Sequence, residues 1–210
     1  MQTLSPHPWR RAPEGPVVAI VMDGVGIGTG DHGDAVAQAH TPTLDALRGL
    51  PSFTSLLAHG TAVGMPSDAD MGNSEVGHNA LGAGRIVDQG AKLVSEAIAS
   101  GALFQGDAWR DAITTVQQSG EPLHFIGLLS DGNVHSHIDH LIALLQRAAS
   151  EGVQRARVHA LVDGRDVPGR SALLYIDRLE QVLANLSHDG RDYRIASGGG
   201  RMVVTMDRYE

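Results

Sequence analysis

Short apolar runs alternate along this chain with segments whose residue pattern predicts a helix. The apolar runs, which predict buried strands, cover residues 17–22, 123–129, 157–162, 193–196 and 202–206. The predicted helices cover residues 41–47, 53–59, 92–102, 107–118, 136–151 and 171–186. Strands that alternate with helices are typical of proteins in which crossover helices join parallel strands. We therefore expect an α/β fold with a parallel sheet.

The segment 136–151 has the clearest helical pattern, because its apolar residues repeat at three- and four-residue spacing. Ser136, followed three residues later by Asp139, resembles a capping box at the start of this helix. His137 and His140 lie on the same helix. We expect both to be capping or surface groups rather than metal ligands.

Composition narrows the possible classes of function. The chain has 210 residues, of which 42% are apolar and 4% aromatic, so it can form one or two domains with an aliphatic core. Acidic residues outnumber basic ones by 24 to 16, and the net charge of -8 argues against a nucleic-acid surface. The absence of cysteine excludes disulfides, a thiol nucleophile and thiolate metal sites. No apolar run approaches the roughly 20 residues of a membrane span, so we expect no membrane partner.

The first fifteen residues differ in composition from the rest of the chain. Residues 1–15 contain three prolines and the pair Arg10-Arg11, and they lack the apolar core of a signal peptide. We interpret this segment as a disordered leader. The protein is accordingly expected to be cytoplasmic.

Two short polar motifs, one at Asp23 and one at Ser74, predict a nucleophilic site. The run 17–22 ends at Asp23-Gly24, which would deliver a carboxylate to the edge of a parallel sheet where α/β proteins bind ligands. Ser74 lies between Gly72 and Gly77 in a polar segment. A serine hydroxyl is a weak nucleophile unless a base or a metal activates it. Together Asp23 and Ser74 suggest one metal-assisted nucleophilic site.

Polar clusters also follow the later apolar runs. The segment 130–137 follows one strand and 163–166 follows the next, and if the strands are parallel both clusters lie at the same edge of the sheet. The segment 198–201 adds glycines and an arginine. Arginine binds carboxylate or phosphate through two parallel hydrogen bonds, so the set suits a small anion. An Asp-Gly pair taken singly is more often a simple turn, but several clusters with His and Arg favour a site.

These motifs also carry a family resemblance. The motifs concerned are Asp23-Gly24, residues 41–45, residues 72–78, residues 130–137, residues 163–166, Gly200-Arg201 and residues 206–208. In this order, from about residue 17 to the last residue, they resemble the N-terminal part of cofactor-independent (2,3-bisphosphoglycerate-independent) phosphoglycerate mutase.

The resemblance implies an enzyme of glycolysis and gluconeogenesis that interconverts 3-phosphoglycerate and 2-phosphoglycerate through a phosphoserine. By position, Ser74 would be the nucleophile, and Asp23 and Ser74 would be ligands of a metal. The intact enzyme would use two divalent ions, usually Mn²⁺, and would be monomeric, with the small-molecule substrate as its partner. The residues implied to bind substrate are His135, Arg165, Asp166, Arg201 and Arg208.

The resemblance further implies an alkaline-phosphatase-like metal-binding domain with an inserted α/β phosphotransferase domain. Residues 16–88 would be the N-terminal part of the first domain, and residues 89–210 part of the inserted one. The remaining metal ligands of the family, an Asp-x-x-x-His, an Asp-His pair and another His, have no counterpart in that context here. Because Mn²⁺ typically takes about six donors, two oxygen ligands hold it poorly. We therefore expect the 210-residue chain on its own to be inactive.

Two other functions are compatible with the motifs. One is a different phosphotransferase of the alkaline phosphatase superfamily, such as a phosphopentomutase, although His135 and the Arg165-Asp166 pair disfavour it. The other is a non-catalytic remnant that binds an anion or a partner chain. Activity towards both phosphoglycerates and a pentose phosphate would distinguish the enzymes, and the sequence beyond Glu210 would distinguish an enzyme from a remnant.

Overall fold

The computed structural model describes residues 5, 7–11 and 13–206, and the chain divides into two compact units, Met1–Ser55 and Leu56–Glu210. The division differs in position from the predicted boundary between residues 88 and 89, and the predicted domains stay a prediction. No helix among the described residues is long and apolar enough to cross a membrane.

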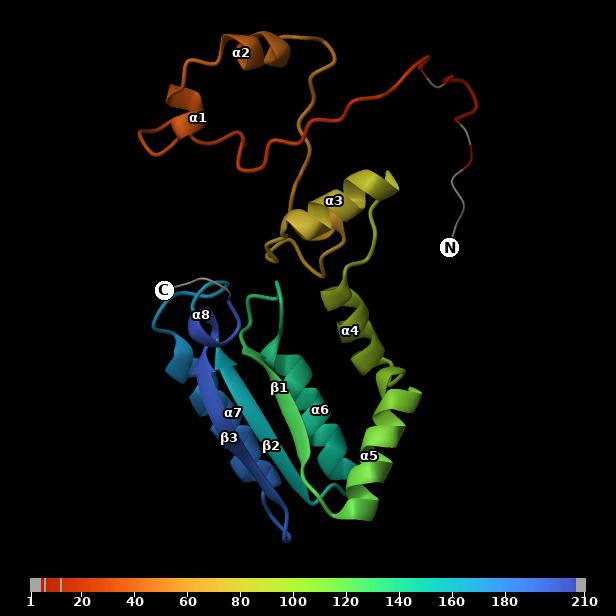
Figure 1. Ribbon diagram of the computed structural model, residues 1–210, viewed down its shortest axis with the longest axis vertical. Helices are drawn as coiled ribbons and strands as arrows, with labels where there is room; N and C mark the ends of the chain where they lie inside the picture. Colours follow the sequence, from red (N-terminus) through yellow and green to blue (C-terminus); the bar gives the residue numbers. More distant parts are fainter. Residues whose placement is uncertain (1–4, 6, 12, 207–210) are drawn as a thin grey trace. The chain divides into compact units, whose positions relative to one another are not determined.

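The first unit contains two short helices, α1 (Ala35–Gln38) and α2 (Pro42–Arg48) (Figure 1). The helix predicted at residues 41–47 is confirmed, with Thr41 at its N-cap and proline in the first turn, where the missing N–H has no cost. In α1 the Asp34 side chain accepts a hydrogen bond from the Ala37 amide, which satisfies a free donor of the first turn.

The strand predicted at residues 17–22 is absent from the structure. Val17, Val18 and Ile20 are 75%, 78% and 82% exposed, and the segment has no regular hydrogen bonding. A strand requires a neighbour to pair with, and no strand among the described residues pairs with this one. The helix predicted at residues 53–59 is also absent. A seven-residue helix is not stable without packing, and the leucines of this segment are 74% exposed.

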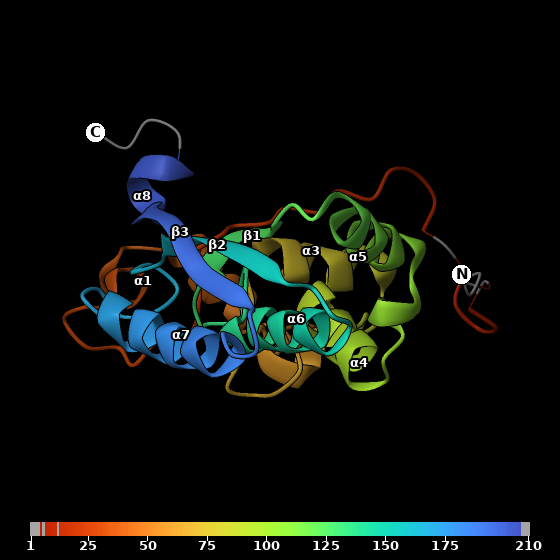
Figure 2. The same cartoon turned by 90° about the horizontal axis from the view of Figure 1, so that it is seen from below.

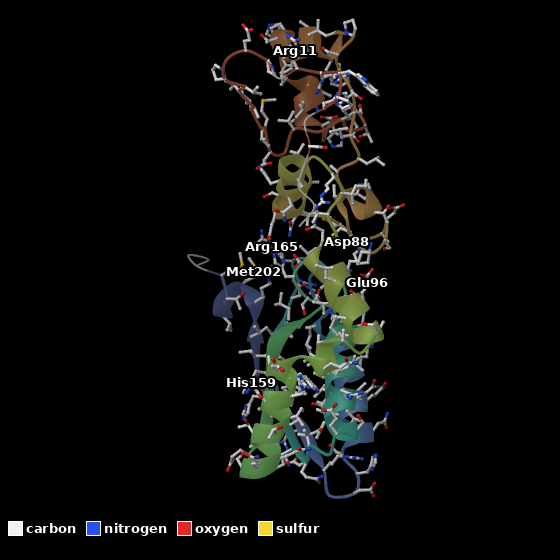
Figure 3. All side chains as sticks on the ribbon, turned by 90° about the vertical axis from the view of Figure 1, so that its right-hand side faces the viewer. Arg11, Asp88, Glu96, His159, Arg165 and Met202 are labelled. Atoms are coloured by element: carbon white, nitrogen blue, oxygen red, sulfur yellow. The ribbon has the colours of Figure 1, made fainter. Side chains whose placement is uncertain are left out.

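The second unit contains the remaining elements in an alternating order. Its helices are η1 (Gly60–Val63), α3 (Ser74–Ala83), α4 (Gly90–Ala99), η2 (Leu103–Gln105), α5 (Asp107–Ser119), α6 (Ile138–Ser150), α7 (Ala172–Leu186) and α8 (Arg201–Val204). Its strands are β1 (Leu123–Leu129), β2 (Arg155–Val162) and β3 (Asp192–Gly200). On the surface of α4, Lys92 forms ion pairs with Asp88 and Glu96, both labelled in Figure 3.

The three strands form a parallel sheet in the order β1-β2-β3. The connections β1-α6-β2 and β2-α7-β3 are crossover helices, which confirms the predicted α/β fold with a parallel sheet. Both helices cover the same face of the sheet (Figure 2). The register between β1 and β2 runs from Leu123 opposite Ala156 to Leu129 opposite Val162. Because the strands are parallel, the loops that follow β1 and β2 lie at the same edge.

The main core lies between the sheet and its helices. Leu129, Ile138, Leu145, Leu179 and Leu183 are each at most 1% exposed within one apolar cluster. Deleting such a side chain typically costs about 2–5 kcal/mol, so this cluster fixes the sheet on which the polar loops are mounted.

The opposite face of the sheet carries polar and apolar side chains that these helices do not cover. His124 Nδ1 lies 2.9 Å from His159 Nε2, and His159 Nδ1 lies 2.7 Å from the Ser197 hydroxyl. Figure 3 labels Arg165 near one end of the sheet and His159 further along it. Ile126 on this face is 77% exposed.

The strand predicted at residues 202–206 is not formed. Residues 202–204 belong instead to the short helix α8 (Arg201–Val204). Val203 and Val204 are 84% and 57% exposed, so this apolar run does not join the sheet. The Thr205 hydroxyl donates a hydrogen bond to the Arg201 carbonyl, which favours the helical turn over an extended one. A short apolar run alone does not distinguish a strand from a helix.

The start of α6 also differs in detail from its prediction. His137 is the N-cap and its side chain accepts a hydrogen bond from the Asp139 amide, so of the two expected roles, capping or surface, it has the first. Ser136 is not the cap, because its hydroxyl donates to the carbonyl of Leu128 at 2.8 Å. The serine therefore fastens the loop after β1 to the end of that strand.

Candidate functional site

Ser74 is the first residue of α3 and is exposed. The preceding Asn73 is the N-cap, and its side-chain oxygen accepts a hydrogen bond from the Val76 amide at 3.0 Å. This cap explains why a polar, glycine-flanked segment begins a helix here rather than remaining a loop. The serine hydroxyl is thus carried at a helix N-terminus, where backbone N–H groups and the helix dipole favour a bound anion.

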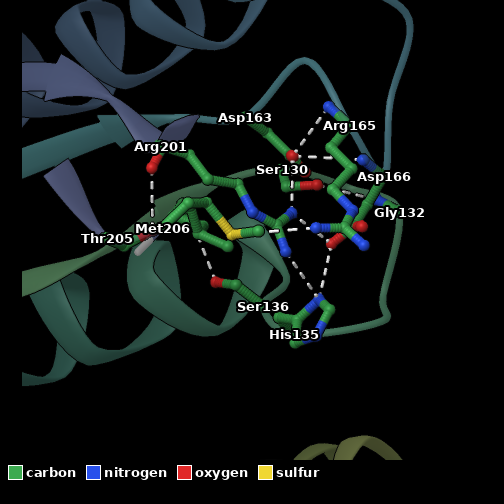
Figure 4. A network of polar contacts seen from close by, with 11 residues as sticks. Ser130, Gly132, His135, Ser136, Asp163, Arg165, Asp166, Arg201, Thr205 and Met206 are labelled. Atoms are coloured by element: carbon green, nitrogen blue, oxygen red, sulfur yellow. Dashed lines mark hydrogen bonds and ion pairs between the residues drawn. The ribbon is translucent and has the colours of Figure 1, made fainter. Parts of the chain in front are cut away.

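Four predicted or motif residues meet at the carboxyl edge of the sheet (Figure 4). Arg201 Nη1 donates to Asp163 Oδ1 at 2.8 Å and to Asp166 Oδ2 at 2.7 Å. His135 Nδ1 lies 2.7 Å from the same Asp166 oxygen. The loops after β1 and β2 and the start of α8 therefore contribute to one polar network, as their positions after parallel strands suggest.

The geometry assigns a tautomer to His135. A carboxylate oxygen accepts hydrogen bonds, so His135 Nδ1 carries the proton that is donated to Asp166. The contact of 3.2 Å between this nitrogen and Arg201 Nη2 is then not a donated hydrogen bond. The His135 side chain is 50% exposed, which leaves Nε2 available to a ligand or to proton transfer.

Arg201 is held inside the network rather than presented to solvent. Its side chain is 5% exposed, and the carboxylate of Asp163 is fully buried. Burial alone would lower the pKa of Arg201, but the hydrogen bonds to Asp166 and Asp163 outweigh it and the pKa is raised. Two carboxylates thus balance its charge, and only a small part of the guanidinium remains open to a ligand.

Arg165 has the opposite environment. It is exposed, its backbone N–H donates to Asp163 Oδ1 at 3.1 Å, and its Nη1 contacts the Met206 sulfur at 3.7 Å. Within the described part of the chain it takes part in no ion pair, so its positive charge is available to an anion. Arg208, the other arginine predicted to bind substrate, lies outside the described residues.

Two further residues support this edge: Tyr175, which the sequence did not single out, and Gly132, which belongs to the predicted cluster 130–137. The Tyr175 hydroxyl donates to Asp131 Oδ1 at 2.6 Å. A β-carbon on Gly132 would lie 2.7 Å from the Asp166 carbonyl oxygen, so only glycine lets the two loops approach this closely. No local pattern pairs α7 with the loop after β1. The Asp-Gly turns themselves were the only signal in the sequence.

A cavity of about 290 Å³ lies between the start of α3, which carries Ser74, and the loop after β1, which carries His135. Its lining includes Asn73 and Glu75, on either side of Ser74, and His135. His140 also lines it, and its Nε2 lies 2.8 Å from the Ser95 hydroxyl. Burial and the neighbouring His137 lower the pKa of His140, so this imidazole is mostly neutral at pH 7.

The family of the chain follows from its sequence. The family model described as BPG-independent PGAM N-terminus matches residues 94–210, which is more than half of the chain. The chain belongs to this family.

Named relatives of this family are closely similar. The 2,3-bisphosphoglycerate-independent phosphoglycerate mutase of Trypanosoma brucei brucei is 56% identical over 209 residues, which are 99% of this chain and 38% of that protein. The enzyme of the same name from Zea mays is 53% identical over 211 residues, again 99% of this chain and 37% of that protein. The chain thus spans somewhat more than a third of the length of these relatives.

A solved structure shares the fold. A crystal structure of Leishmania mexicana phosphoglycerate mutase at low cobalt concentration is 55% identical, with a TM-score of 0.82, over 90% of this chain and 35% of the other. The α/β arrangement with a parallel sheet is therefore that of a phosphoglycerate mutase over the matched region.

The two residues of this family member that were predicted to bind metal lie in different units. Asp23 belongs to the first unit and Ser74 to the second, and both are exposed. Among the described residues no group of three or more His, Asp or Glu side chains could hold a metal ion. A carboxylate and a serine oxygen are donors that a divalent ion such as Mn²⁺ accepts, but they fill only two of about six positions. The donor types of Asp23 and Ser74 suit a divalent ion, and their joint metal site stays a prediction.

Proposed function

We propose that the full-length protein containing this chain interconverts 3-phosphoglycerate and 2-phosphoglycerate through a phosphoserine at Ser74. The observation that carries the proposal is the cavity that Asn73 and Glu75, which flank Ser74, share with His135. His135 in turn belongs to the network with Asp166 and Arg201. Ser74 is thus next to two residues of this lining, and transfer of a phosphoryl group to and from serine requires a nucleophile near a site that binds the anionic substrate.

The chemistry follows from the placement of these side chains. Ser74 Oγ attacks the substrate phosphorus, the bond from phosphorus to the glycerate oxygen breaks, and that oxygen takes up the serine proton. First-turn amides of α3 stabilise the phosphoryl oxygens. His135 Nε2, whose ring is oriented by Asp166, carries the proton to or from the glycerate hydroxyl groups. Arg165 binds the anionic glycerate, which then accepts the phosphoryl group on its other hydroxyl.

We further propose that the reaction depends on Mn²⁺, with Asp23 and Ser74 as two ligands and the others supplied by chain outside this segment. When bound, the metal would supply positive charge beside the serine oxygen and the phosphate, which would ease their approach. The oxygen donor types of the two residues support this assignment.

The domain interpretation is part of the same proposal. We propose that residues 16–88 belong to an alkaline-phosphatase-like metal-binding domain and residues 89–210 to an inserted phosphotransferase domain. That all three strands of the sheet lie within the second segment supports this division. A monomeric, cytoplasmic enzyme completes the proposal.

The decisive experiment uses the protein encoded by the complete open reading frame. With Mn²⁺ it is expected to convert 3-phosphoglycerate to 2-phosphoglycerate and to turn over a pentose phosphate far more slowly. Mass spectrometry of acid-quenched enzyme is expected to detect phosphate on Ser74, and Ser74→Ala is expected to abolish both signals. Ser150→Ala, at an exposed serine, is the control. Full turnover by Ser74→Ala, or a preference for pentose phosphate, would refute the proposal.

A second assay concerns the 210-residue chain alone. Because it provides only part of the metal site, we expect no measurable turnover of phosphoglycerate at any Mn²⁺ concentration. Normal activity of this chain would show that the metal site is complete without further ligands.

A further inference from the structure

One hydrogen bond joins the segment that carries Ser74 to the loop that carries His135. Asn133 Nδ2 donates to Asp70 Oδ1 at 2.7 Å, between residues 63 positions apart in the chain. Asn133 is 8% exposed. Asp70 lies four residues before Ser74, and Asn133 lies two residues before His135. The bond is therefore close in the chain to both functional residues, although neither of them takes part in it.

Asp70 is anchored on its own side. Its other carboxylate oxygen accepts from the Ser67 amide at 2.7 Å and from the Ser67 hydroxyl at 2.8 Å. Its carbonyl oxygen accepts from the Gly60 amide at 3.2 Å. Burial opposes ionisation of Asp70, but the hydrogen bonds from Asn133 and Ser67 outweigh it and the pKa is lowered. The carboxylate is therefore charged at neutral pH, and its bond to Asn133 is charge-assisted.

Asn133 is equally constrained by its own loop. Its φ of 56° lies in the left-handed region, which asparagine tolerates better than most residues other than glycine. Glycine could adopt this backbone but would lose the amide that reaches Asp70. The preceding Gly132 packs against the backbone of Asp166. The side chain of Asn133 thus connects the Ser74 segment to a loop that itself contacts the substrate-binding edge.

We propose that Asp70 and Asn133 are positioning residues that hold the phosphorylated serine against the glycerate site. This inference rests on the proposed phosphoserine mechanism. When the Ser74 segment and the His135 loop are held together, the phosphorus–Oγ bond breaks as the phosphorus–glycerate oxygen bond forms, and the proton of that glycerate hydroxyl passes to Oγ. When they separate, water enters: its oxygen bonds to phosphorus, the phosphorus–Oγ bond breaks, and a water proton returns to the serine. The pair therefore sets the ratio of phosphoryl transfer to hydrolysis.

The variants separate positioning from folding. Asn133→Gly keeps the backbone conformation and removes the donor, and Asn133→Asp places a second carboxylate against Asp70. The double variant Asp70→Asn with Asn133→Asp restores the bond with donor and acceptor reversed. The asparagine side chain at position 70 donates to the aspartate at position 133, and its oxygen can still accept from Ser67. Ser67→Ala is the control, because it removes one hydrogen bond from Asp70 and leaves the bond to Asn133.

The test measures isomerisation of 3-phosphoglycerate and release of inorganic phosphate in one reaction of the Mn²⁺-loaded full-length protein. For Asn133→Gly we expect kcat for isomerisation to fall about tenfold or more, with KM little changed. Phosphate released per isomerisation should rise by about tenfold. The double variant should recover to within about threefold of the wild type, and Ser67→Ala should stay within about twofold. A proportional loss of both reactions, unchanged ratios, or no rescue by the double variant would overturn the inference.

A measurement without turnover keeps this test independent of the proposed function. The Val76 amide donates a hydrogen bond to the N-cap side chain of Asn73. In the 210-residue chain, Asn133→Gly is expected to accelerate hydrogen exchange of this amide by about tenfold. Ser67→Ala should leave this exchange rate nearly unchanged. Unchanged exchange in Asn133→Gly would overturn the coupling itself, whereas a wild-type protein that fails to isomerise phosphoglycerate would refute only the function.

Discussion

Arg201 and Asp163 form a buried ion pair at the carboxyl edge of the sheet, with Nη1 2.8 Å from Oδ1. The same carboxylate oxygen accepts the backbone N–H groups of Arg165 and Asp166, each at 3.1 Å. One carboxylate therefore fixes a guanidinium and the backbone of two neighbouring residues. Asp163 is the centre of the network, although the resemblance gave it no role in binding.

We predict that Asp163→Ala strongly destabilises the second unit. It leaves Arg201 with Asp166 as its one remaining carboxylate partner in the described network, and breaking a buried pair typically costs about 3–5 kcal/mol. Urea unfolding followed by the fluorescence of Trp109, which packs against the core, measures the effect. The control is Asp139→Ala, which removes an exposed ion pair with Arg178 and should cost at most about 1 kcal/mol. Equal losses in the two variants would contradict the prediction.

We also predict that acid destabilises the fold through Asp163 and Asp70. In each, burial raises the pKa, but hydrogen bonds outweigh it and the pKa lies below the ordinary 3.8. A folded pKa below the unfolded one contributes stability above the unfolded value, and this contribution is lost as pH falls through the folded value. The free energy of unfolding should therefore fall as the pH drops below the ordinary value of 3.8 towards the lowered folded values. Asp163→Asn should show a shallower fall, and an unchanged slope would contradict the assignment.

A third prediction compares two glycines of positive φ. A β-carbon on Gly64 (φ 86°) would lie 1.8 Å from the carbonyl oxygen of Val87, whereas Gly84 (φ 62°) has nothing within 4 Å. Gly84→Ala should lower the free energy of unfolding by about 1 kcal/mol, because alanine is less stable than glycine in the left-handed conformation. Gly64→Ala should cost at least about 2 kcal/mol more, because backbone must move. Hydrogen exchange of the Gln89 amide, which donates to the Gly64 carbonyl, measures the local loss.

The parallel sheet could be predicted because its strands and helices carry their own signals. The strand 123–129 has the predicted bounds, and the long periodic helices lie within a few residues of theirs. The segments 17–22 and 202–206 carry an apolar signal of similar kind but do not form strands. Whether a short apolar run becomes a strand depends on a neighbour to pair with, and the run itself contains no information about that neighbour.

The site was predictable to the extent that strand order determines it. His135 and Asp166 follow adjacent parallel strands, so their meeting at one edge follows from the alternation of strands and helices. The burial of Arg201 between two carboxylates did not follow, because it depends on how α8 turns after β3. The bond between Asp70 and Asn133 could not be predicted either, since its partners belong to segments with no common pattern.

The last prediction concerns two buried tyrosines. Burial, helped by Asp131 in the first case, raises the pKa of Tyr175 to about 12, and burial raises the pKa of Tyr193 to about 12. A folded pKa above the ordinary 10.0 contributes stability below pH 10 that is lost as pH rises towards 12. At about pH 11 the native chain should therefore show roughly 1.6 fewer tyrosinates than the urea-unfolded chain by ultraviolet absorbance.

Single substitutions assign these two phenols. Tyr175→Phe and Tyr193→Phe should each reduce the difference between native and unfolded absorbance by roughly 0.8 tyrosinate. Tyr193 donates to the Val153 carbonyl and Tyr175 to the Asp131 carboxylate, so Tyr175 remains a hydrogen-bond donor to the loop after β1 throughout the physiological range. If Tyr175→Phe left the difference unchanged, Tyr175 would titrate normally, and the support it gives to the loop that carries His135 would be lost above about pH 10.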